Sequence, residues 1–308
     1  MTETPRKLII VGSGPAGLTS AIYSARGNLK PLVISGRAAG GQLMLTTDVD
    51  DFPGFEMGVQ GPDLMDKMRK QAARFETEFV EEDVISVDFK TKPFQIQTET
   101  KTLTAESVII ATGASAMWLN LPSEQKLRGR GVSACAVCDG LFFKDKVVAV
   151  VGGGDTAMRE TQHLSKVCKK VILIHRRGEF KAQNALVKLI KSKENVEFMM
   201  NASVTEVLGE EKVTGIKVQD TQTKDTKELA LDGLFIAIGH KPNTDFLKGQ
   251  VELDEIGYVV VRDHTNTSVE GIFSAGDVSD HRYRQGVTAA GAGCMAALDV
   301  EDYLEHHS

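Results

Sequence analysis

One short pattern occurs twice in this chain and restricts the possible fold more than any other feature of the sequence. An apolar run at residues 8–11 leads into the glycine pattern G-x-G-x-x-G at residues 12–17, and an amphipathic helix and a second apolar run at residues 32–34 follow. Glycines in such a turn let the backbone approach a pyrophosphate, and the N-terminus of the next helix offers free N–H groups to its charge. This segment therefore predicts a strand–helix–strand unit that binds a nucleotide.

The same unit recurs in the middle of the chain. An apolar run at residues 147–151 precedes the pattern G-x-G-x-x-A, which Gly152, Gly154 and Ala157 form, and residues 171–174 make the second run after a helix. A single glycine pattern also fits a tight turn with no ligand, but two complete units with matched spacing predict two nucleotide sites. We therefore expect an α/β protein with two Rossmann-like domains, each a three-layer ββα arrangement.

The composition favours a globular protein with no nucleic acid or membrane partner. The 308 residues are 42% hydrophobic, enough to build two cores, and 36 Lys and Arg against 42 Asp and Glu give a net charge of -6. An acidic balance disfavours nucleic acids and anionic membranes, and no apolar run reaches the length of a membrane span. The N-terminal residues lack the pattern of a signal peptide, and four cysteines are too few for a disulfide scaffold, so we expect a reducing cytoplasm.

The residues after the second strand of the central unit indicate which nucleotide it binds. His175, Arg176 and Arg177 follow the strand, and Lys181 comes shortly after them. An acidic residue at this place would accept a hydrogen bond from the ribose 2′-hydroxyl of NADH, whereas guanidinium groups suit the 2′-phosphate of NADPH. The sequence therefore favours NADPH, with a solvated basic turn as the alternative.

The first unit has no acidic residue after its second strand, where residues 35–37 are Ser-Gly-Arg, so by itself it leaves a second NADPH site possible. The C-terminal segment indicates a flavin instead. There a short strand ends in Gly276 and Asp277, and a helix rich in small residues begins near Arg284 and Gln285. A carboxylate at a strand end can hold the ribityl chain of FAD, and a helix N-terminus can stabilise the anion of the reduced flavin.

Two further apolar runs end in glycine and mark the expected edges of the two sheets. They end at Thr112-Gly113 and at Ile238-Gly239, and a ligand crevice lies beyond such strand ends. The FAD segments then occupy residues 1–116 and 245–308, and the NADPH domain, residues 117–244, is inserted between them. We expect the FAD-binding domain to be discontinuous in sequence and the inserted domain to carry a cysteine pair.

Cys135 and Cys138 form that pair, a C-x-x-C pattern followed directly by Asp139. Two chemistries fit such a pair: a redox-active disulfide, or half of a zinc site. Zinc requires four ligands, and the sequence offers no second C-x-x-C and no cysteine–histidine pair at a suitable spacing. Cys168 and Cys294 are isolated and fit buried apolar positions. The pair therefore favours redox chemistry.

Taken together in this order, the motifs resemble those of the bacterial-type, low-molecular-weight thioredoxin reductases along essentially the whole chain. The resemblance implies FAD, NADPH, a redox-active disulfide, a homodimer and a thioredoxin-like protein as the substrate. It also implies that Cys138 is the thiol that faces the flavin and that Cys135 attacks the disulfide of the substrate. Asp139 is then the candidate acid/base that gives a proton to the departing thiolate, although Asp before Gly140 also fits a simple turn.

The cofactor contacts that these motifs and the resemblance imply fall into two groups. The expected FAD residues are Gly12, Ser13, Gly14, Pro15, Ala16, Gly17, Ser35, Gly36, Gly41, Gln42, Leu43, Asp51, Val84, Ala111, Thr112, Gly113, Gly276, Asp277, Arg284, Gln285 and Gly286. The expected NADPH residues are Gly152, Gly154, Asp155, Thr156, His175, Arg176, Arg177, Lys181, Ile238 and Gly239. No metal ligand is expected.

Four positions depart from the family pattern. Asp51 stands where Asn is usual, Gly286 replaces Ala, and Lys181 replaces Arg, which keeps the charge but loses the planar fork. Arg159 occupies the first of two positions that are often both Glu, and Glu160 remains at the second. None of these positions belongs to the cysteine pair.

The residues around the cysteine pair are candidates for contact with the substrate protein. Arg130, Leu141 and Phe142 flank the pair, and exposed arginine and aromatic side chains are favoured anchors at protein interfaces. Residues 141–143 fit equally well as core at the start of the next element. The alternative function is a flavoprotein of the same family that reduces another thiol-disulfide protein, such as a peroxiredoxin or a glutaredoxin-like partner. A non-catalytic dinucleotide sensor would leave the cysteine pair and Asp139 without a role.

Overall fold

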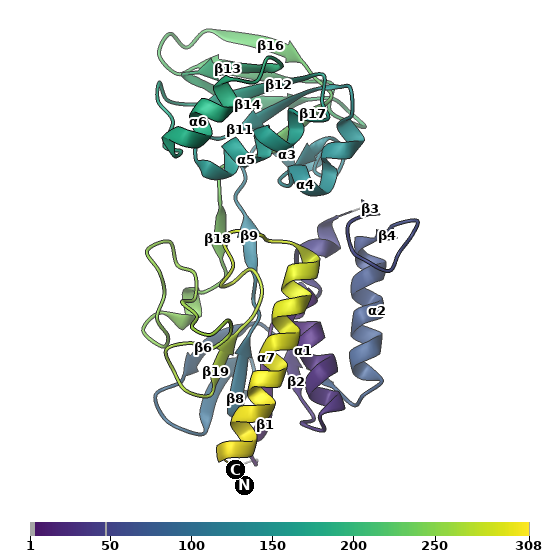
Figure 1. Cartoon of the computed structure of the whole chain (residues 1–308), viewed down its shortest axis with the longest axis vertical. Coiled ribbons are helices and arrows are strands. Elements are labelled where there is room, and N and C mark those ends of the chain that lie inside the picture. The colour runs from purple at the N-terminus through teal and green to yellow at the C-terminus, as the bar shows by residue number, and fades with distance from the viewer. Residues whose placement is uncertain (1–3, 47, 308) are drawn as a thin grey trace. The chain divides into compact units, whose positions relative to one another are not determined.

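The structure is a computed structural model that describes residues 4–46 and 48–307. The chain divides into two compact units, which Figure 1 shows with their elements labelled. The first unit combines Met1–Ser115 with Lys241–Ser308, and the second is the continuous segment Ala116–His240. A segment from the middle of the chain is therefore inserted into a unit that the two ends of the chain build together.

The first unit is built on a seven-stranded sheet among the described residues, in the order β5-β2-β1-β8-β7-β6, with β19 paired to β8. Its parallel strands are β1 (Arg6–Val11), β2 (Leu32–Ile34), β5 (Glu78–Val80), the C-terminal half of β8 (Thr102–Ile110) and β19 (Ile272–Ser274). The strands β6 (Val84–Asp88) and β7 (Phe94–Thr98) join antiparallel through the N-terminal half of β8. The parallel part is the Rossmann-like portion of the unit.

Alternate residues of β1 serve two different cores. Leu8 and Ile10 pack with the helices α1 (Pro15–Arg26) and α7 (Gly286–His307) on one face of the sheet. Ile9 and Val11 face the opposite core, which the segment around Leu247 and Val259 covers. A strand buried on both faces is a continuous apolar run rather than an alternating one, which explains the sequence of this strand.

Helices α1 and α7 lie against each other closely because small residues line their contact (Figure 1). A Cβ on Gly293 of α7 would lie 2.1 Å from the carbonyl oxygen of Ala16 in α1. The hydroxyl of Ser20 donates to the carbonyl oxygen of Gly293 at 2.9 Å. This contact brings the last helix of the chain onto the first, so the C-terminal segment completes the unit that the N-terminal segment begins.

Five further elements complete the described part of the first unit. They are the 3-10 turn η1 (Gly41–Leu45), the strands β3 (Asp48–Val49) and β4 (Val59–Gln60), the helix α2 (Gly61–Ala73) and the turn η3 (Asp245–Leu247). Two further short strands, β9 (Ala114–Ala116) and β18 (His240–Pro242), pair with each other where the chain passes between the units.

The second unit has three layers. A parallel sheet in the order β10-β17-β11-β12-β13 lies between helices on one face and an antiparallel sheet of β14, β15 and β16 on the other. The parallel strands are β10 (Val132–Ser133), β11 (Val147–Val151), β12 (Lys170–His175), β13 (Val196–Met200) and β17 (Gly233–Ile236). The antiparallel strands are β14 (Ala202–Leu208), β15 (Gly215–Asp220) and β16 (Thr226–Ala230), and the helical elements are α3 (Pro122–Lys126), α4 (Ala136–Asp139), η2 (Gly140–Phe143), α5 (Asp155–Leu164) and α6 (Asn184–Lys191).

The alternation of side chains along β11 builds both cores of this unit. Val148 and Val150 pack toward α5 and α6, whereas Ala149 and Val151 pack toward the antiparallel sheet. This is the ββα arrangement expected from the sequence, and the predicted α/β class with two Rossmann-like domains is confirmed.

The observed limits of the inserted unit, 116–240, differ from the expected limits, 117–244, mainly at the second crossing. There β18 pairs with β9, and the side-chain amide of Asn243 donates to the carbonyl oxygen of Thr112 at 2.8 Å. The hydroxyl of Thr112 donates to the carbonyl oxygen of Asn243 at 2.9 Å in return. These contacts attach residues 241–244 to the first unit. They join residues far apart in the sequence, so a local sequence pattern does not predict them.

Candidate active site

The first glycine turn is shaped by two close backbone contacts and one open position. Gly12 has a φ of +116°, and a Cβ there would lie 2.2 Å from the carbonyl oxygen of Ala111. A Cβ on Gly17 would lie 2.0 Å from the carbonyl oxygen of Gly12, whereas Gly14 has nothing within 4 Å of the place of its Cβ. Gly12 and Gly17 therefore allow β1 and α1 to meet, and Gly14 leaves open space at the start of α1, where helix N–H groups favour a phosphate.

A hydroxyl ties the next expected segment to this turn. Ser13 donates to the carbonyl oxygen of Ser35 at 3.0 Å and accepts from the N–H of Gly40 at 2.9 Å. A Cβ on Gly41 would lie 3.4 Å from the Cα of Gly14. The segment that continues into Gln42 and Leu43 is thus held beside the open position of the turn.

The C-terminal segment reaches the same place through three contacts. A Cβ on Gly276 would lie 2.8 Å from the Cβ of Ala16, just after the turn. A Cβ on Gly286, the first residue of α7, would lie 3.5 Å from side-chain atoms of Leu43 and of Phe52. Three segments therefore meet in this unit. They are the start of α1, residues 41–43, and the start of α7 with the preceding Arg284 and Gln285.

Asp277 is a partly buried carboxyl group that directly follows Gly276. Burial raises its pKa to about 7, the neighbouring carboxylate of Asp280 adds to the increase, and the guanidinium of Arg284 opposes it. A desolvated carboxylate gains from hydroxyl groups that donate hydrogen bonds to it. Asp277 is therefore suited to accept hydrogen bonds from the hydroxyl groups of a flavin's polyol chain.

The remaining expected FAD residues lie at the margins of this region. Gly36 is next to Arg37, whose N–H donates to the carboxylate of Asp83 at 3.0 Å, and Val84 directly follows Asp83. Thr112 makes the hydrogen bonds with Asn243 described above, and the carbonyl oxygen of the adjacent Gly113 accepts from the N–H of Asn243 at 3.0 Å.

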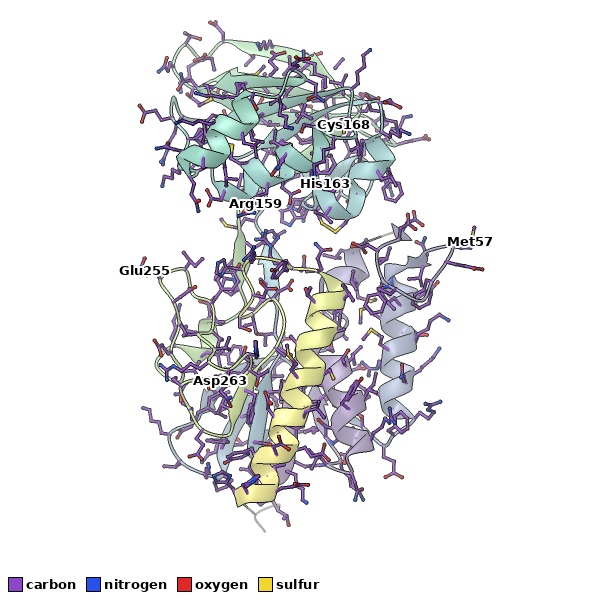
Figure 2. All side chains as sticks on the ribbon, viewed as in Figure 1. Met57, Arg159, His163, Cys168, Glu255 and Asp263 are labelled. Atoms are coloured by element: carbon purple, nitrogen blue, oxygen red, sulfur yellow. A yellow bond between two sulfur atoms is a disulfide. The ribbon has the colours of Figure 1, made fainter. Side chains whose placement is uncertain are left out.

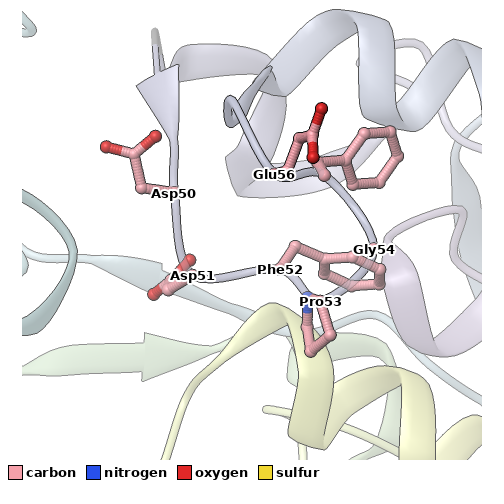
Figure 3. A pocket seen from close by; sticks show the side chains of 7 residues that line it. Asp50, Asp51, Phe52, Pro53, Gly54 and Glu56 are labelled. Carbon is pink, nitrogen blue, oxygen red and sulfur yellow. The ribbon is translucent and has the colours of Figure 1, made fainter.

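Asp51 belongs to a loop, residues 50–56, that lines a wide-open hollow of about 500 Å³ (Figure 3). Its neighbour Phe52 contacts the start of α7, as noted above. Figure 3 shows the carboxylates of Asp50 and Asp51 at one end of the loop and the ring of Phe52 further along it. The contact of Phe52 places the loop beside the expected flavin region.

The second glycine turn repeats the arrangement of the first. A Cβ on Gly152 would lie 2.3 Å from the carbonyl oxygen of Ala237, whereas Gly154, just before α5, has nothing within 4 Å of the place of its Cβ. The carboxylate of Asp155 accepts from the backbone N–H of Gln183 at 2.8 Å and from its side-chain amide at 2.9 Å. Asp155 thereby joins the start of α5 to the start of α6, and Thr156 follows it in the first turn of α5.

His175 and the two arginines after it lie in different environments. The His175 ring is buried against Gly153, and one of its ring nitrogens lies 3.0 Å from the carbonyl oxygen of Glu179. Burial lowers the pKa of His175, and the charges of Arg177 and Arg176 lower it further. The structure thus gives this ring a packing position behind the turn, where it is neutral at pH 7.

Arg176, Arg177 and Lys181 are exposed and lie beside the second turn. The backbone N–H of Lys181 donates to the carbonyl oxygen of Gly153 at 2.8 Å, which fixes the segment to the turn. Residues 178–180 line one side of a hollow of about 670 Å³. Ile238 and Gly239 follow β17, and the carbonyl oxygen of Gly239 accepts from the N–H of Met117 at 3.0 Å. Three exposed cations in the segment that follows β12 suit a phosphate monoester.

The cysteine pair forms a disulfide at the start of α4, visible as the yellow bond in the upper unit of Figure 2. Cys135 is the N-cap of α4, and its sulfur accepts from the N–H of Cys138 at 3.2 Å. The N–H of Cys135 donates to the hydroxyl of Ser133 at 3.0 Å, and the N–H of Asp139 donates to the carbonyl oxygen of Cys135 at 3.1 Å. Asp139 therefore lies in the same short helix as Cys138, directly after the N-cap residue Cys135 and the three residues that follow it.

The other two cysteines are free. Burial and the charge of Asp145 raise the pKa of Cys168 to about 11, which leaves its thiol protonated and unreactive. Among residues 4–46 and 48–307, no three His, Cys, Asp or Glu side chains are grouped so that they would hold a metal ion. In the same residues, no helix has the length and apolar character needed to cross a membrane.

The residues after the disulfide divide between surface and core. Leu141 is 66% exposed and Phe142 is 44% exposed, and Val137 within α4 is also exposed. Phe143 is buried, and its ring centroid lies 5.3 Å from that of Phe235 in β17. Arg130 is exposed as well. An apolar surface patch beside a disulfide is thus present, and only the last residue of the run belongs to the core.

Both units are Rossmann-like and each has an open glycine turn, and the second unit also holds the disulfide. These features define the class of an oxidoreductase that uses nucleotides and a redox-active cysteine pair. The sequence matches the family described as pyridine nucleotide-disulphide oxidoreductase over residues 6–293. The chain therefore belongs to this family, whose cofactors are FAD and a pyridine nucleotide.

Individual relatives resemble the chain over almost its whole length. It is 50% identical to a thioredoxin reductase of Coxiella burnetii, over 97% of this chain and 96% of that protein. It is 51% identical to a glucosaminate ammonia-lyase of Pseudomonas fluorescens, with the same coverage. A solved thioredoxin reductase from Giardia duodenalis superposes with a TM-score of 0.94 at 42% identity, over 97% of this chain and 98% of that one.

We expect Asp277 to make the stability of the apoprotein depend on pH. The native carboxyl keeps its proton up to about pH 7, whereas the unfolded chain loses it near 3.8, so stability falls as the pH rises through this window. Asp277→Asn should remove this part of the decrease, so its melting temperature should fall less between pH 5 and about pH 8 than that of the wild type. The exposed Asp63→Asn is the control, and identical pH profiles for all three proteins would contradict the expectation.

Proposed function

We propose that this chain is an NADPH-dependent thioredoxin-disulfide reductase. The observation that carries the proposal is the Cys135–Cys138 disulfide, held in the same unit as a nucleotide turn flanked by exposed Arg176 and Arg177. The thioredoxin reductases at about half identity support it. FAD belongs to the first unit and NADPH to the second, and the substrate is the disulfide of a thioredoxin.

Each glycine turn binds its cofactor mainly through backbone N–H groups. The N-terminus of α1 and the open position at Gly14 receive the pyrophosphate of FAD, and Asp277 accepts hydrogen bonds from its polyol chain. The N-terminus of α5 and Gly154 receive the pyrophosphate of NADPH. When bound, the two cofactors supply the two electrons that reduce the disulfide.

The cysteine pair carries these electrons to the substrate by thiol–disulfide exchange. Breaking the Cys135–Cys138 bond takes two electrons and two protons and gives two thiols. The Cys135 thiolate then attacks the substrate disulfide, forms a mixed disulfide and releases one substrate thiolate. The Cys138 thiolate attacks the Cys135 sulfur, restores the original bond and releases the second substrate thiolate. Asp139 holds the proton that is exchanged with the Cys138 sulfur.

The test of this function uses the two cysteines separately. Purified holoenzyme should be yellow and should bleach with NADPH, and Cys135→Ser and Cys138→Ser should each abolish the reduction of thioredoxin while bleaching remains. Removing either sulfur leaves no disulfide to accept the electrons. Cys168→Ser is the control and should keep full activity, because its thiol is buried and takes no part in the disulfide. Thioredoxin reduction that persists in both active-pair variants would refute the mechanism.

The choice of nucleotide depends on the exposed cations. Replacing both Arg176 and Arg177 with Ala should raise the KM for NADPH strongly and the KM for NADH little, because only NADPH carries the 2′-phosphate. Each lost charge-assisted contact costs about 1.5–3 kcal/mol, or roughly tenfold or more in affinity. Steady-state kinetics with both nucleotides measures this, and equal increases for the two would show that the arginines do not recognise the phosphate.

The surface around the disulfide is the proposed contact for thioredoxin, with Arg130, Leu141 and Phe142 in it. Phe142→Ala should raise the KM for thioredoxin about tenfold or more, the usual scale for a truncated aromatic anchor, and leave a small-molecule disulfide substrate unaffected. Phe143→Ala is the matched control: it should lose about 3–5 kcal/mol of stability, because Phe143 packs in the core. A Phe142→Ala protein that loses stability and both activities in parallel would contradict the docking role.

A homodimer is proposed for the assembly and the cytoplasm for the location. Val287, Met295 and Leu298 form an exposed apolar stripe on α7, and Tyr23 of α1, which is hydrogen-bonded to Cys294, lies beside it. A stripe of this kind on a helix supports burial against a second copy. Sedimentation equilibrium should show a dimer for the wild type and a weaker dimer for Leu298→Lys. A monomeric wild type would exclude the proposed homodimer.

The two free thiols support a reducing compartment, which fractionation of cells would test.

A further inference from the structure

Helix α4 is attached to α5 by contacts that none of the steps above uses. A Cβ on Gly140, directly after α4, would lie 3.3 Å from side-chain atoms of His163 and of Leu164 in α5. One turn before His163, Glu160 accepts a hydrogen bond from the backbone N–H of Ala136. Ala136 is fully buried and Glu160 is partly buried, so this bond is partly shielded from water. Figure 2 shows His163 on α5 above the disulfide.

The Ala136 N–H has a particular place in the cysteine pair. It belongs to the peptide bond that follows Cys135, the N-cap residue of α4. Free backbone N–H groups at such a position stabilise the thiolate of an N-cap cysteine and lower its pKa. Here the first of these N–H groups is already taken by a carboxylate. The carboxylate also brings a negative charge to the peptide group that follows Cys135, and like charges disfavour each other in a partly buried place.

The state of the sulfur atoms decides how strongly the pair reduces its substrate. Reduction of the disulfide takes two electrons and two protons, and one thiol then loses a proton if its pKa lies below the pH. Any group that stabilises the thiolate stabilises the reduced pair and makes the disulfide a better oxidant. A pair that must give its electrons to thioredoxin, itself a strongly reducing dithiol, needs the opposite.

We propose that Glu160 is a positioning residue that keeps the Cys135–Cys138 pair strongly reducing, because it holds the Ala136 N–H and a negative charge beside Cys135. The proposal rests on the proposed function of this disulfide. Glu160 itself exchanges no electrons and forms no bond to the substrate. It sets the equilibrium between the disulfide and the two thiols, and through it the direction in which the two electrons pass.

Other charged groups surround the pair and are the same in every variant compared below. Asp139 on α4 is a second carboxyl group, and Arg159 on α5 is an exposed cation. Burial lowers the pKa of His163, and the charge of Lys166 lowers it further, so His163 is neutral at pH 7. Exposed Lys144, just after η2, and Arg130 lie on the neighbouring segments. The variants compared at position 160 differ in that side chain and in no other residue.

The experiment measures the disulfide equilibrium of the holoenzyme in dithiothreitol redox buffers. After an acid quench and alkylation, mass spectrometry of the peptide that contains Cys135 and Cys138 gives the reduced fraction. Glu160→Gln, which keeps an acceptor oxygen but not the charge, should shift the equilibrium constant toward the reduced pair about threefold to tenfold at pH 7. Tenfold corresponds to about 30 mV for a two-electron couple. Glu160→Ala, which also frees the Ala136 N–H, should shift it at least as far.

Dependence on pH separates the proposal from a merely structural role. A thiolate forms only above its pKa, so the shift should be small at pH 6 and larger at pH 8. The exposed Glu194→Gln, the same change of charge elsewhere in the unit, should not move the equilibrium. If Glu160→Ala fails to fold, Glu160→Gln, which has almost the same shape, carries the test.

The possible outcomes are distinct. A wild-type equilibrium constant in Glu160→Gln, or a shift that is equal at pH 6 and pH 8, would overturn the proposal. Failure of the proposed function has a different result: the wild-type enzyme would not pass electrons from NADPH to thioredoxin, while the dithiothreitol equilibria would still be measurable.

Discussion

The close approach of backbone atoms at the two glycine turns is the constraint on which the rest of the structure depends. A Cβ would lie 2.2 Å from a carbonyl oxygen at Gly12 and 2.3 Å from one at Gly152, so only glycine lets each first strand, the next helix and a neighbouring strand meet there. Once they meet, the free N–H groups at the start of α1 and α5 are aimed at a fixed place. Gly14 and Gly154 keep that place open, which is why the remaining segments of both sites gather around the turns.

Helix α5 joins the two chemical tasks of the second unit. It begins directly after Gly154 at the nucleotide turn, and further along it contacts α4 through Glu160 and His163. Because a helix is stiff over this length, the disulfide and the nucleotide turn keep a constant spacing within the unit. This arrangement gives a physical reason for a reactive thiol pair so close in sequence to a nucleotide turn.

Much of the fold and of the candidate site is local in the sequence, and that part is predictable. The strands at residues 8–11 and 147–151, both glycine turns and the C-x-x-C pair are each coded within a few residues. Residues 141–143 show what such patterns do not predict. From the sequence alone, each of the three side chains could be either buried in the core or exposed at the surface. The structure buries Phe143 against Phe235 and exposes Leu141 and Phe142, because only one side of this short turn faces the sheet.

The class of fold, the two glycine turns and the position of the cysteine pair follow from the sequence, because the need for glycine in a tight turn and the C-x-x-C spacing are local properties. Only the tertiary structure decided which distant partners complete them. Glu160 meets the Ala136 N–H, Gln183 meets Asp155, and the His175 ring is buried behind its turn rather than exposed with the arginines. These contacts join residues on different elements, and their geometry is set by how helices and sheets pack, which no spacing along the chain encodes.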